Sequence, residues 1–144
     1  MSELTAFSIE DLELVELTQE TTEMGVNVNF PFTPEFPATT GHELEGGHNV
    51  VYFEIEPGKE LGTHTDSPEE IIVCLRGDDI EAWAGEAEGT ISGGDIAVIP
   101  PMAPHGFHNG GEETARFLGF FSDATNVSEF EEELQPMGET VVKG

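Results

Sequence analysis

The sequence predicts an all-β fold, either a β-sandwich or a β-barrel, and three observations support this class. Short segments of apolar or alternating apolar and polar residues recur along the chain, which is typical of strands. Glycine and proline residues separate these segments at short intervals, as turns between closely spaced strands do. The chain has 144 residues, which is the length of one domain that can bury a substantial core.

The N-terminal part predicts few regular elements. Ser8 is placed to cap a short turn, and the leucines within residues 12–17 suggest an early strand. Residues 26–32 alternate between apolar and polar side chains, which predicts a half-buried strand. Residues 33–47 are rich in Pro, Thr and Gly and are expected to form a loop, and residues 49–56 predict the next strand.

The middle of the chain predicts a series of short strands with turn residues between them. These strands are expected at residues 63–66, 70–76, 79–84, 88–92, 95–99, 105–109 and 114–122. Many short strands at such spacing indicate a sandwich or a barrel.

One short helix is predicted near the C-terminus. Ser128 and Glu131 have the spacing of a capping box ahead of the apolar residues Phe130 and Leu134. No repeat or linker is evident, so we expect one domain in three parts. These parts are N-terminal strands and a loop at residues 1–48, a core at 49–122, and a helix with a tail at 123–144.

The charge of the chain excludes several classes of partner. Thirty acidic residues against four basic ones give a formal charge of -26 and a pI near 4.1, so nucleic acid and anionic membranes are not expected partners. No apolar run has the length of a membrane span, and residues 1–3 do not resemble the start of a secretory signal. A single cysteine, Cys74, rules out a disulfide within the chain. We therefore expect a cytoplasmic protein.

The near absence of lysine and arginine gives the acidity a specific meaning. Aromatic residues are spread along the chain and the acidic residues are mixed with apolar ones, so the pattern is not that of a disordered acidic tail. The composition resembles that of proteins from extreme halophiles, in which concentrated cations screen the carboxylates. The alternative is an acidic protein of an ordinary cytoplasm.

Four polar residues form the candidate site. His64 and Asp66 lie two apart in a predicted strand, so their side chains leave the same face. Glu70 begins an otherwise apolar strand, and His105 begins another after a proline-rich corner. If the ends of these strands meet, two imidazoles and two carboxylates converge, which suffices for a divalent transition metal.

The spacing of these residues resembles the first conserved motif of the cupin family. That motif has a glycine, five residues, His-x-His, three or four residues, a glutamate, six residues and a glycine. In this chain the motif corresponds to residues 58–77, where its defined positions are Gly58, His64-Thr65-Asp66, Glu70 and Gly77. Every spacing matches, with Asp66 in place of the second histidine.

Residues 94–109 resemble the second cupin motif. That motif has a glycine, five residues, Pro-x-Gly, two residues, a histidine, three residues and an asparagine. Its counterparts are Gly94, Pro100, His105 and Asn109, and Met102 stands in place of the last glycine. The chain is identified by these two motifs as a member of the cupin superfamily.

The resemblance implies a fold and a set of ligands. It implies a small jelly-roll barrel, with His64, Glu70 and His105 at three of the four metal-ligand positions and Asp66 at the fourth. Because many cupins are dimers, it also implies a homodimer.

The aspartate changes what such a site can bind. Oxygen donors shift the preference toward iron or manganese, with zinc or nickel as further options. Three outcomes remain open. Asp66 binds the metal directly, or it lies behind the metal ligands and supports them or acts as a catalytic base, or the site holds no metal. Glu70 and Asp66 are the candidate proton acceptors of a catalytic step.

The resemblance leaves the function open between two classes. One is a metal-dependent enzyme acting on a small organic molecule by dioxygenase-like oxidation or cleavage, and the other is a non-catalytic module that binds a metal or small ligand. Sugar or keto-acid isomerisation would favour more cationic residues than this chain has. A looser pattern of His64, Asp66, His105 and Arg116 resembles the 2-oxoglutarate-dependent oxygenases, in which an arginine holds the co-substrate. The simpler interpretation places Arg116 at the surface.

The remaining candidates are expected to lie outside the site. His42 and His48 fall in a loop, and His108 should point to the opposite face from His105. Cys74 should be a small buried side chain.

Overall fold

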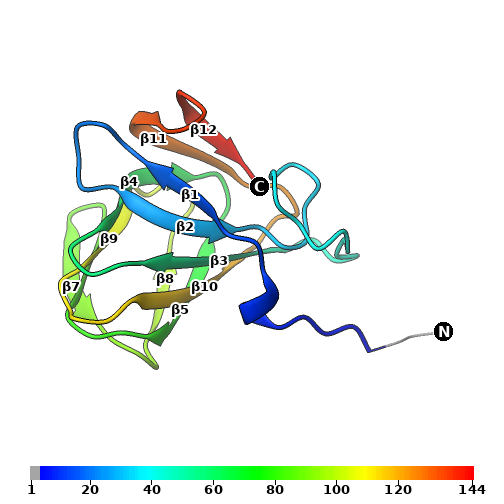
Figure 1. Ribbon diagram of the computed structural model, residues 1–144, viewed down its shortest axis with the longest axis horizontal. Coiled ribbons are helices and arrows are strands. Elements are labelled where there is room, and N and C mark those ends of the chain that lie inside the picture. Colours follow the sequence, from blue (N-terminus) through cyan, green and yellow to red (C-terminus); the bar gives the residue numbers. More distant parts are fainter. Residues whose placement is uncertain (1–3) are drawn as a thin grey trace.

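A computed structural model of the protein describes residues 4–144 and contains twelve β-strands after one short 3-10 helix (Figure 1). Residues 1–3, on which the expectation about a secretory signal depends, lie outside the described residues. The elements are η1 (Ile9–Asp11), β1 (Val15–Thr18), β2 (Gly25–Asn29), β3 (Asn49–Ile55), β4 (Glu60–Asp66), β5 (Glu70–Arg76), β6 (Ile80–Ala84), β7 (Ala87–Ile91), β8 (Ile96–Ile99), β9 (His105–Asn109), β10 (Ala115–Phe121), β11 (Val127–Leu134) and β12 (Glu139–Lys143).

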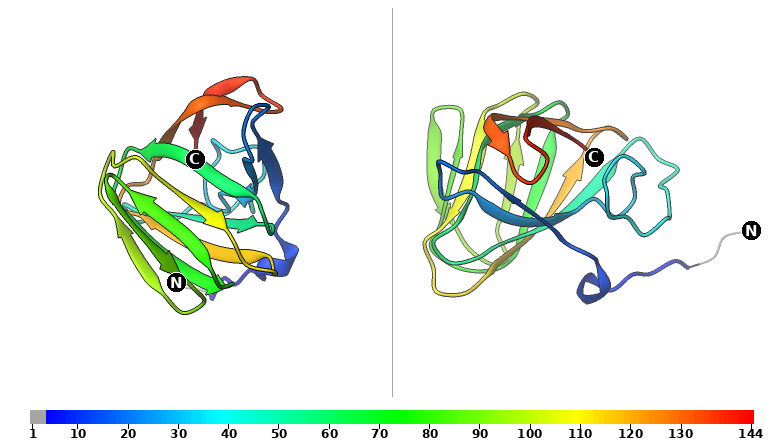
Figure 2. Two further views of the ribbon diagram at one scale, coloured as in Figure 1. Left: turned by 90° about the vertical axis from the view of Figure 1, so that its left-hand side faces the viewer. Right: turned by 45° about the horizontal axis from the view of Figure 1, so that its top comes forward.

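The strands form two six-stranded antiparallel sheets that face each other (Figure 2). The first sheet has the order β1-β2-β3-β10-β5-β8, and the second has the order β12-β11-β4-β9-β6-β7. The predicted all-β class is confirmed. The expected closed barrel is not found, because hydrogen-bonded pairing ends at both edges of each sheet and strands that follow each other, such as β7 and β8, belong to different sheets.

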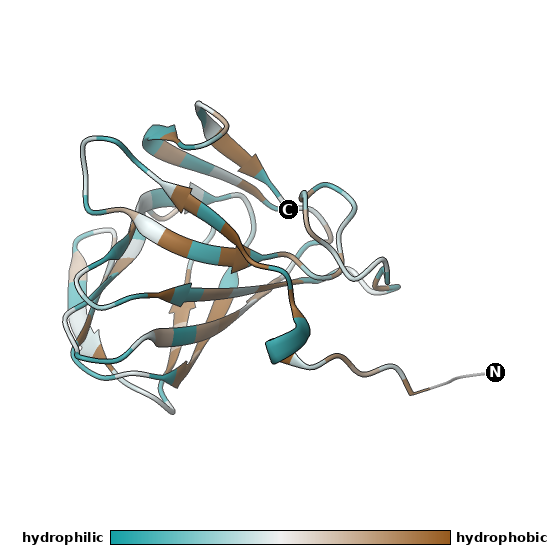
Figure 3. Cartoon of the chain, viewed as in Figure 1, coloured by the Kyte–Doolittle hydropathy of each residue, from teal (hydrophilic) through white to brown (hydrophobic). Residues whose placement is uncertain are grey.

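Apolar side chains from both sheets fill the space between them. Along the strands, buried and more exposed positions alternate, as in β4 and β10, and Figure 3 shows apolar and polar bands alternating along β2. Phe53 of β3 stacks on Phe117 of β10, with ring centroids 4.7 Å apart. Burial of this alternating face stabilises the sandwich through the hydrophobic effect.

The predicted N-terminal elements occur at slightly different positions. Ser8 caps η1, where its side chain accepts a hydrogen bond from the backbone N–H of Glu10. The early strand is β1, and the predicted strand at 26–32 is the shorter β2. Residues 33–47 form no strand or helix, in agreement with the predicted loop.

The turn residues of the two motifs have the backbone conformations that their positions require. Gly77 has a φ of +123°, which disfavours any other residue. Met102 has a φ of +61° although it is not glycine, so the chain keeps the turn conformation at the position where the cupin motif has a glycine.

The predicted C-terminal helix is wrong. Residues 127–134 form β11, which pairs with β12 on one side and with β4 on the other. Residues Ser128 to Leu134 alternate between buried and exposed positions at their N-terminal end, a pattern that suits a strand as well as a short helix. Pairing with the edge of β4 decides between the two, and local sequence cannot show that pairing. No helix in the described part of the chain is long and apolar enough to cross a membrane.

Candidate metal centre

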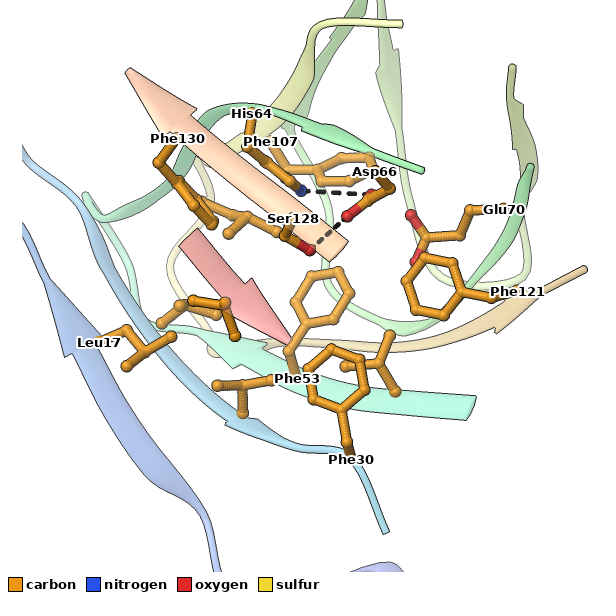
Figure 4. Close-up of a pocket in the computed structure, with 15 residues that line it drawn as sticks. Leu17, Phe30, Phe53, His64, Asp66, Glu70, Phe107, Phe121, Ser128 and Phe130 are labelled. Carbon is orange, nitrogen blue, oxygen red and sulfur yellow. Dashed lines mark hydrogen bonds and ion pairs between the residues drawn. The ribbon is translucent and has the colours of Figure 1, made fainter. Parts of the chain in front are cut away.

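The strand β4 supplies two of the four predicted site residues. His64 and Asp66 are both buried and leave the same face of the strand, as their spacing predicted. The Nε2 atom of His64 lies 3.5 Å from Oδ2 of Asp66 (Figure 4). The two side chains therefore act as neighbours in one interior site.

The neighbouring strand β9 brings the second histidine to this pair. His105 lies directly opposite His64 in the β4–β9 register, with ring centroids 4.2 Å apart, and its Nε2 lies 3.1 Å from Oδ2 of Asp66. The corner before β9 is hydrogen-bonded to the end of β4, because the backbone N–H of Met102 donates to the carbonyl of Asp66 over 2.9 Å. The proline-rich corner thus sets where His105 enters the site.

The fourth residue comes from the facing sheet. Glu70, the first residue of β5, is buried, and its Oε1 lies 3.6 Å from Nε2 of His105. Gly119 of β10 makes room for it, because a Cβ atom there would lie 2.3 Å from Oε2 of Glu70. His64, Asp66 and His105 form the tightest group, with one ligand atom from each within 4.8 Å of the others, and Glu70 stands beside this group.

Backbone carbonyls fix which nitrogen of each histidine faces the site. The Nδ1 of His64 lies 2.8 Å from the carbonyl of Gly62, and the Nδ1 of His105 lies 2.8 Å from the carbonyl of Ala103. A carbonyl only accepts hydrogen bonds, so both Nδ1 atoms carry the proton. Both Nε2 atoms are thereby directed at the carboxylates, which is the arrangement that metal-binding histidines use.

The charges inside the site are strongly coupled. Burial opposes ionisation of Asp66, yet hydrogen-bonding contact with His105 and His64 holds the pKa of this carboxyl well below its usual range. Burial alone would lower the pKa of His105, but Asp66 and Glu70 raise it to about 10. Burial, with help from the charge of Asp66, raises the pKa of Glu70 to about 8. Without a metal, the site at neutral pH therefore holds an ionised Asp66 beside protonated His105 and Glu70.

The residues present fit a divalent metal ion. Oδ2 of Asp66 and Nε2 of His105 are buried 3.1 Å apart, but neither atom has a well-directed hydrogen bond, which is costly unless another group satisfies them. A metal ion would satisfy both atoms and would take the place of the protons on His105 and Glu70. Two nitrogen and two oxygen donors are a set that iron and manganese accept.

Three contributors to the site were not assigned to it by the sequence analysis. Ser128 donates a hydrogen bond from its hydroxyl to Oδ1 of Asp66 over 2.5 Å, and Asn126 lies behind it. The ring of Phe130 stacks on His64, with centroids 4.5 Å apart. All three are at the start of β11 or just before it, and the predicted helix had given Ser128 a different role. Only the pairing of β11 with β4 reveals them.

A small apolar cavity opens beside the site (Figure 4). Its volume is about 50 Å³, enough for a few water molecules. The polar lining residues are His64, Asp66, Glu70 and Ser128, and the apolar ones are Leu17, Val26, Val28, Phe30, Val51, Phe53, Leu61, Phe107, Phe121, Phe130 and Val142. No lysine or arginine lines it.

Arg116 lies outside the site, as the simpler interpretation held. Its guanidinium binds Glu10 at 2.6 Å and the hydroxyl of Tyr52 at 2.7 Å, on the outer side of β10. It is not among the residues that line the cavity. The pattern of a 2-oxoglutarate-dependent oxygenase therefore lacks its co-substrate arginine here.

The other residues set aside in the sequence analysis also lie apart from the site. His42 and His48 are exposed in the loop before β3. His108 is half-buried on the face opposite to His105, where its ring faces Glu23 and Glu81. Cys74 is buried, and burial raises the pKa of its thiol.

Comparison with protein families agrees with the motifs. Residues 51–121 match the family model described as the Cupin domain. This segment contains both motifs and all four residues of the candidate metal centre. No curated protein matches the sequence significantly.

Solved structures share the fold. The chain resembles a cupin 2 conserved barrel domain protein from Rhodopseudomonas palustris, with a TM-score of 0.60, 21% identity, and coverage of 77% of this chain and 71% of that one. It also resembles the polyketide cyclase RemF from Streptomyces resistomycificus, with a TM-score of 0.59, 19% identity, and coverage of 83% and 79%. A third structure, described as a sugar phosphate isomerase of the cupin superfamily from Silicibacter pomeroyi, gives a TM-score of 0.65, 15% identity, and coverage of 97% and 92%. At these identities the likeness establishes the fold, and because these proteins have different described activities, the fold does not select the reaction.

Proposed function

We propose that this chain, which the domain match and the shared fold support as a member of the cupin superfamily, is a metal-dependent enzyme that acts on a small organic molecule. The observation that carries the proposal is the buried group of His64, Asp66 and His105, with Glu70 beside it. The metal would be one divalent transition ion, with iron or manganese favoured by the two oxygen donors and zinc or nickel as further options.

The cavity restricts the class of substrate. Eleven of its fifteen lining residues are apolar, and none is cationic. A divalent ion bound by two carboxylates and two neutral imidazoles leaves a site of zero net charge, so nothing in the lining compensates a substrate phosphate or a multiply charged acid. The substrate is therefore a small, mainly apolar molecule that carries one polar group able to bind a metal.

The reaction that we propose is dioxygenase-like oxidation or cleavage. The metal, when bound, supplies a Lewis acid and coordination positions for substrate and dioxygen. Glu70 takes a proton from the polar group of the substrate at its carboxylate, from the sheet opposite to His64 and His105. Phe121 and Phe130 keep water away from the reacting groups. Asp66 keeps its negative charge, because the two histidines stabilise it.

The alternative is a module that binds a metal or small ligand without turnover. The small cavity favours this alternative, since it leaves little room for a substrate beside a metal. The two functions differ in what happens after binding. Oxygen consumption by the iron-loaded and manganese-loaded protein, with a panel of diols, flavonols and thiols, separates them.

We expect oxygen uptake with at least one uncharged member of this panel, and loss of that uptake in the Glu70→Gln variant. The variant keeps the shape of the side chain but removes the proton acceptor and one charged oxygen donor, so oxygen uptake is compared at equal metal content. Metal binding without oxygen uptake for any member would support the binding module instead. Absence of metal binding under all loading conditions would contradict the enzyme and would leave a module that binds a small ligand without a metal.

We also propose that the chain forms a homodimer through the outer face of the first sheet. The outward positions of β5, β8 and the adjoining part of β10 carry no carboxylate, although acidic residues outnumber basic ones thirty to four in the chain. These positions are Ile71, Val73, Leu75, Ile96, Val98, Leu118 and Phe120. Ile96 and Val98 are 68% and 59% exposed on the edge strand β8. An apolar sheet face is complementary to its own copy, since a two-fold axis brings apolar against apolar.

Sedimentation equilibrium in concentrated KCl tests this dimer. The wild type is expected to be dimeric, and the Val98→Glu variant is expected to be monomeric. Met137→Glu, which alters another exposed apolar residue away from this face, is the matched control and should stay dimeric. A monomeric wild type, or a dimer unaffected by Val98→Glu, would contradict the assignment.

A further inference from the structure

The strand β11 places a chain of polar groups against the side of Asp66 that faces away from the histidines. The Ser128 hydroxyl donates to Oδ1 of Asp66 over 2.5 Å. The Nδ2 amide of Asn126 donates to Oγ of Ser128 over 2.8 Å and lies 3.4 Å from the same Oδ1. All three residues are buried, with exposed fractions of 6% or less. Water therefore has little access to Oδ1 of Asp66.

The fold holds these groups in place by two independent pairings. Ser128 lies directly opposite Asp66 in the β11–β4 register, so its hydroxyl reaches the carboxylate without a long side chain. Asn126 exchanges two backbone hydrogen bonds with Gly144, at 3.1 Å and 3.0 Å. The C-terminal end of the chain thereby fixes Asn126, and Asn126 in turn orients the Ser128 hydroxyl.

The two oxygens of Asp66 consequently have different surroundings. Oδ1 accepts the hydrogen bond from Ser128, whereas Oδ2 faces the Nε2 atoms of His64 and His105 at 3.5 Å and 3.1 Å without a well-directed hydrogen bond. An aspartate is shorter than the histidine found at this position in the cupin motif, so its direction matters more for reaching a common metal.

We infer that Ser128, supported by Asn126, is a positioning residue that makes Asp66 bind the metal through Oδ2 alone. The inference rests on the proposed metal centre. Removal of the hydroxyl would leave Oδ1 buried without its main donor, and the carboxylate would turn toward other partners or offer both oxygens to the ion. Loss of such a supporting hydrogen bond typically weakens metal binding by about ten- to a hundredfold.

The experiment measures Mn²⁺ and Co²⁺ affinity of the full chain in concentrated KCl by competition with a chelator, together with the visible absorption of the Co²⁺ form. Ser128→Ala is expected to bind both ions about ten- to a hundredfold more weakly than the wild type. Its Co²⁺ spectrum is expected to change in intensity, since the coordination of the ion changes. Ser128→Thr keeps a hydroxyl and is expected to restore both the affinity and the spectrum.

Ser67 offers a matched control at the same junction of strands. Its Oγ accepts the backbone N–H of Val127 over 3.0 Å and does not contact the carboxylate. Ser67→Ala is therefore expected to keep wild-type affinity. If Ser128→Ala does not fold, Ser128→Cys keeps the approximate size with a weaker donor, and weaker metal binding than in the wild type is expected.

A double substitution separates positioning from a general structural effect. In an Asp66→Asn background, Ser128→Ala should weaken metal binding by less than twofold, because no carboxylate remains to be positioned. An equal loss with and without Asp66, or a Ser128→Ala variant with wild-type affinity and spectrum, would overturn the inference while leaving the metal centre intact. A wild-type chain that binds neither ion would overturn the proposed metal centre and this inference with it.

Discussion

The carboxylates of this protein fall into two groups with opposite surroundings. In residues 4–144, Asp66 and Glu70 are the only buried acidic residues, and the others are exposed or half-buried. The two interior carboxylates face two histidines and apolar side chains, whereas the outer ones face water, and a few of them pair with an arginine or with His108. The same chemical group therefore lies beside candidate metal ligands inside the sandwich and meets solvent outside it. The formal charge of -26 counts both groups, but only two of the thirty acidic residues are the interior Asp66 and Glu70.

The interior carboxylates should affect the free energy of unfolding most strongly when a neighbouring histidine is removed. His105→Ala would leave Asp66 buried without its nearest cationic partner, at 3.1 Å in the wild type. Breaking a buried ion pair in this way costs about 3–5 kcal/mol of unfolding free energy. Urea denaturation of the metal-free variant and of the wild type measures this loss. A change below about 1 kcal/mol would show that the interior pair behaves like a surface pair.

The pH dependence of the metal-free protein should come from the interior group. His105 has its pKa raised from 6.5 to about 10 and Glu70 from 4.5 to about 8, so the folded state binds protons more tightly than the unfolded state. Stability is then lost as pH rises from about 4.5, where Glu70 ionises in the unfolded chain, toward 10, by on the order of 2–4 kcal/mol because the two coupled groups share the protons. The pKa of Asp66 is lowered instead, so its contribution to the free energy of unfolding is lost only as the pH falls below the usual pKa of an aspartate.

Thermal melting of chelator-treated protein between pH 6.5 and 9.5 measures this dependence. The melting temperature of the wild type is expected to fall, and that of Glu70→Gln is expected to fall less steeply, because one of the two titrating groups is removed. A melting temperature that rises over the same range would contradict the raised pKa values of His105 and Glu70.

The exterior group should dominate the dependence on salt. Because exposed carboxylates repel one another and salt screens this repulsion, the melting temperature is expected to rise between about 0.1 M and about 3 M KCl. This rise is the property that a halophilic origin of the chain would require. An unchanged melting temperature over this range would contradict the proposed salt adaptation.

The smallest effect is expected for a single exposed ion pair. Glu113 lies 3.1 Å from Arg76, and their side chains are 47% and 64% exposed. Glu113→Gln should change the unfolding free energy by less than about 0.5 kcal/mol, as is usual for such pairs. A loss comparable to that of His105→Ala would remove the distinction between interior and exterior carboxylates.

The sequence predicted well those features that depend on residues close together in the chain, such as the face of a strand or the position of a turn. The spacing of His64 and Asp66 puts both on one face of any strand, and turn residues such as Gly77 mark where strands end. The two motifs located all four residues of the candidate centre, and the geometry brings them together around Oδ2 of Asp66 and Nε2 of His105.

The parts that escaped prediction depend on contacts between distant segments. The Ser128–Glu131 pattern satisfies a local rule for a helix, but pairing with β4, more than sixty residues earlier, gives a strand instead. Strand spacing left a sandwich or a barrel open and the resemblance to cupins implied the barrel, but neither determines whether the edges of two sheets meet. For the same reason, neither Ser128 nor Gly119 could be assigned to the site from the sequence.

Elemental analysis of the protein prepared in concentrated salt tests the central claim most directly. We expect one iron or manganese ion per wild-type chain after loading, and strongly reduced metal in His64→Ala and Asp66→Ala, because both side chains belong to the buried three-residue group. Full metal content in both variants, or none in the wild type, would contradict a metal centre at this position.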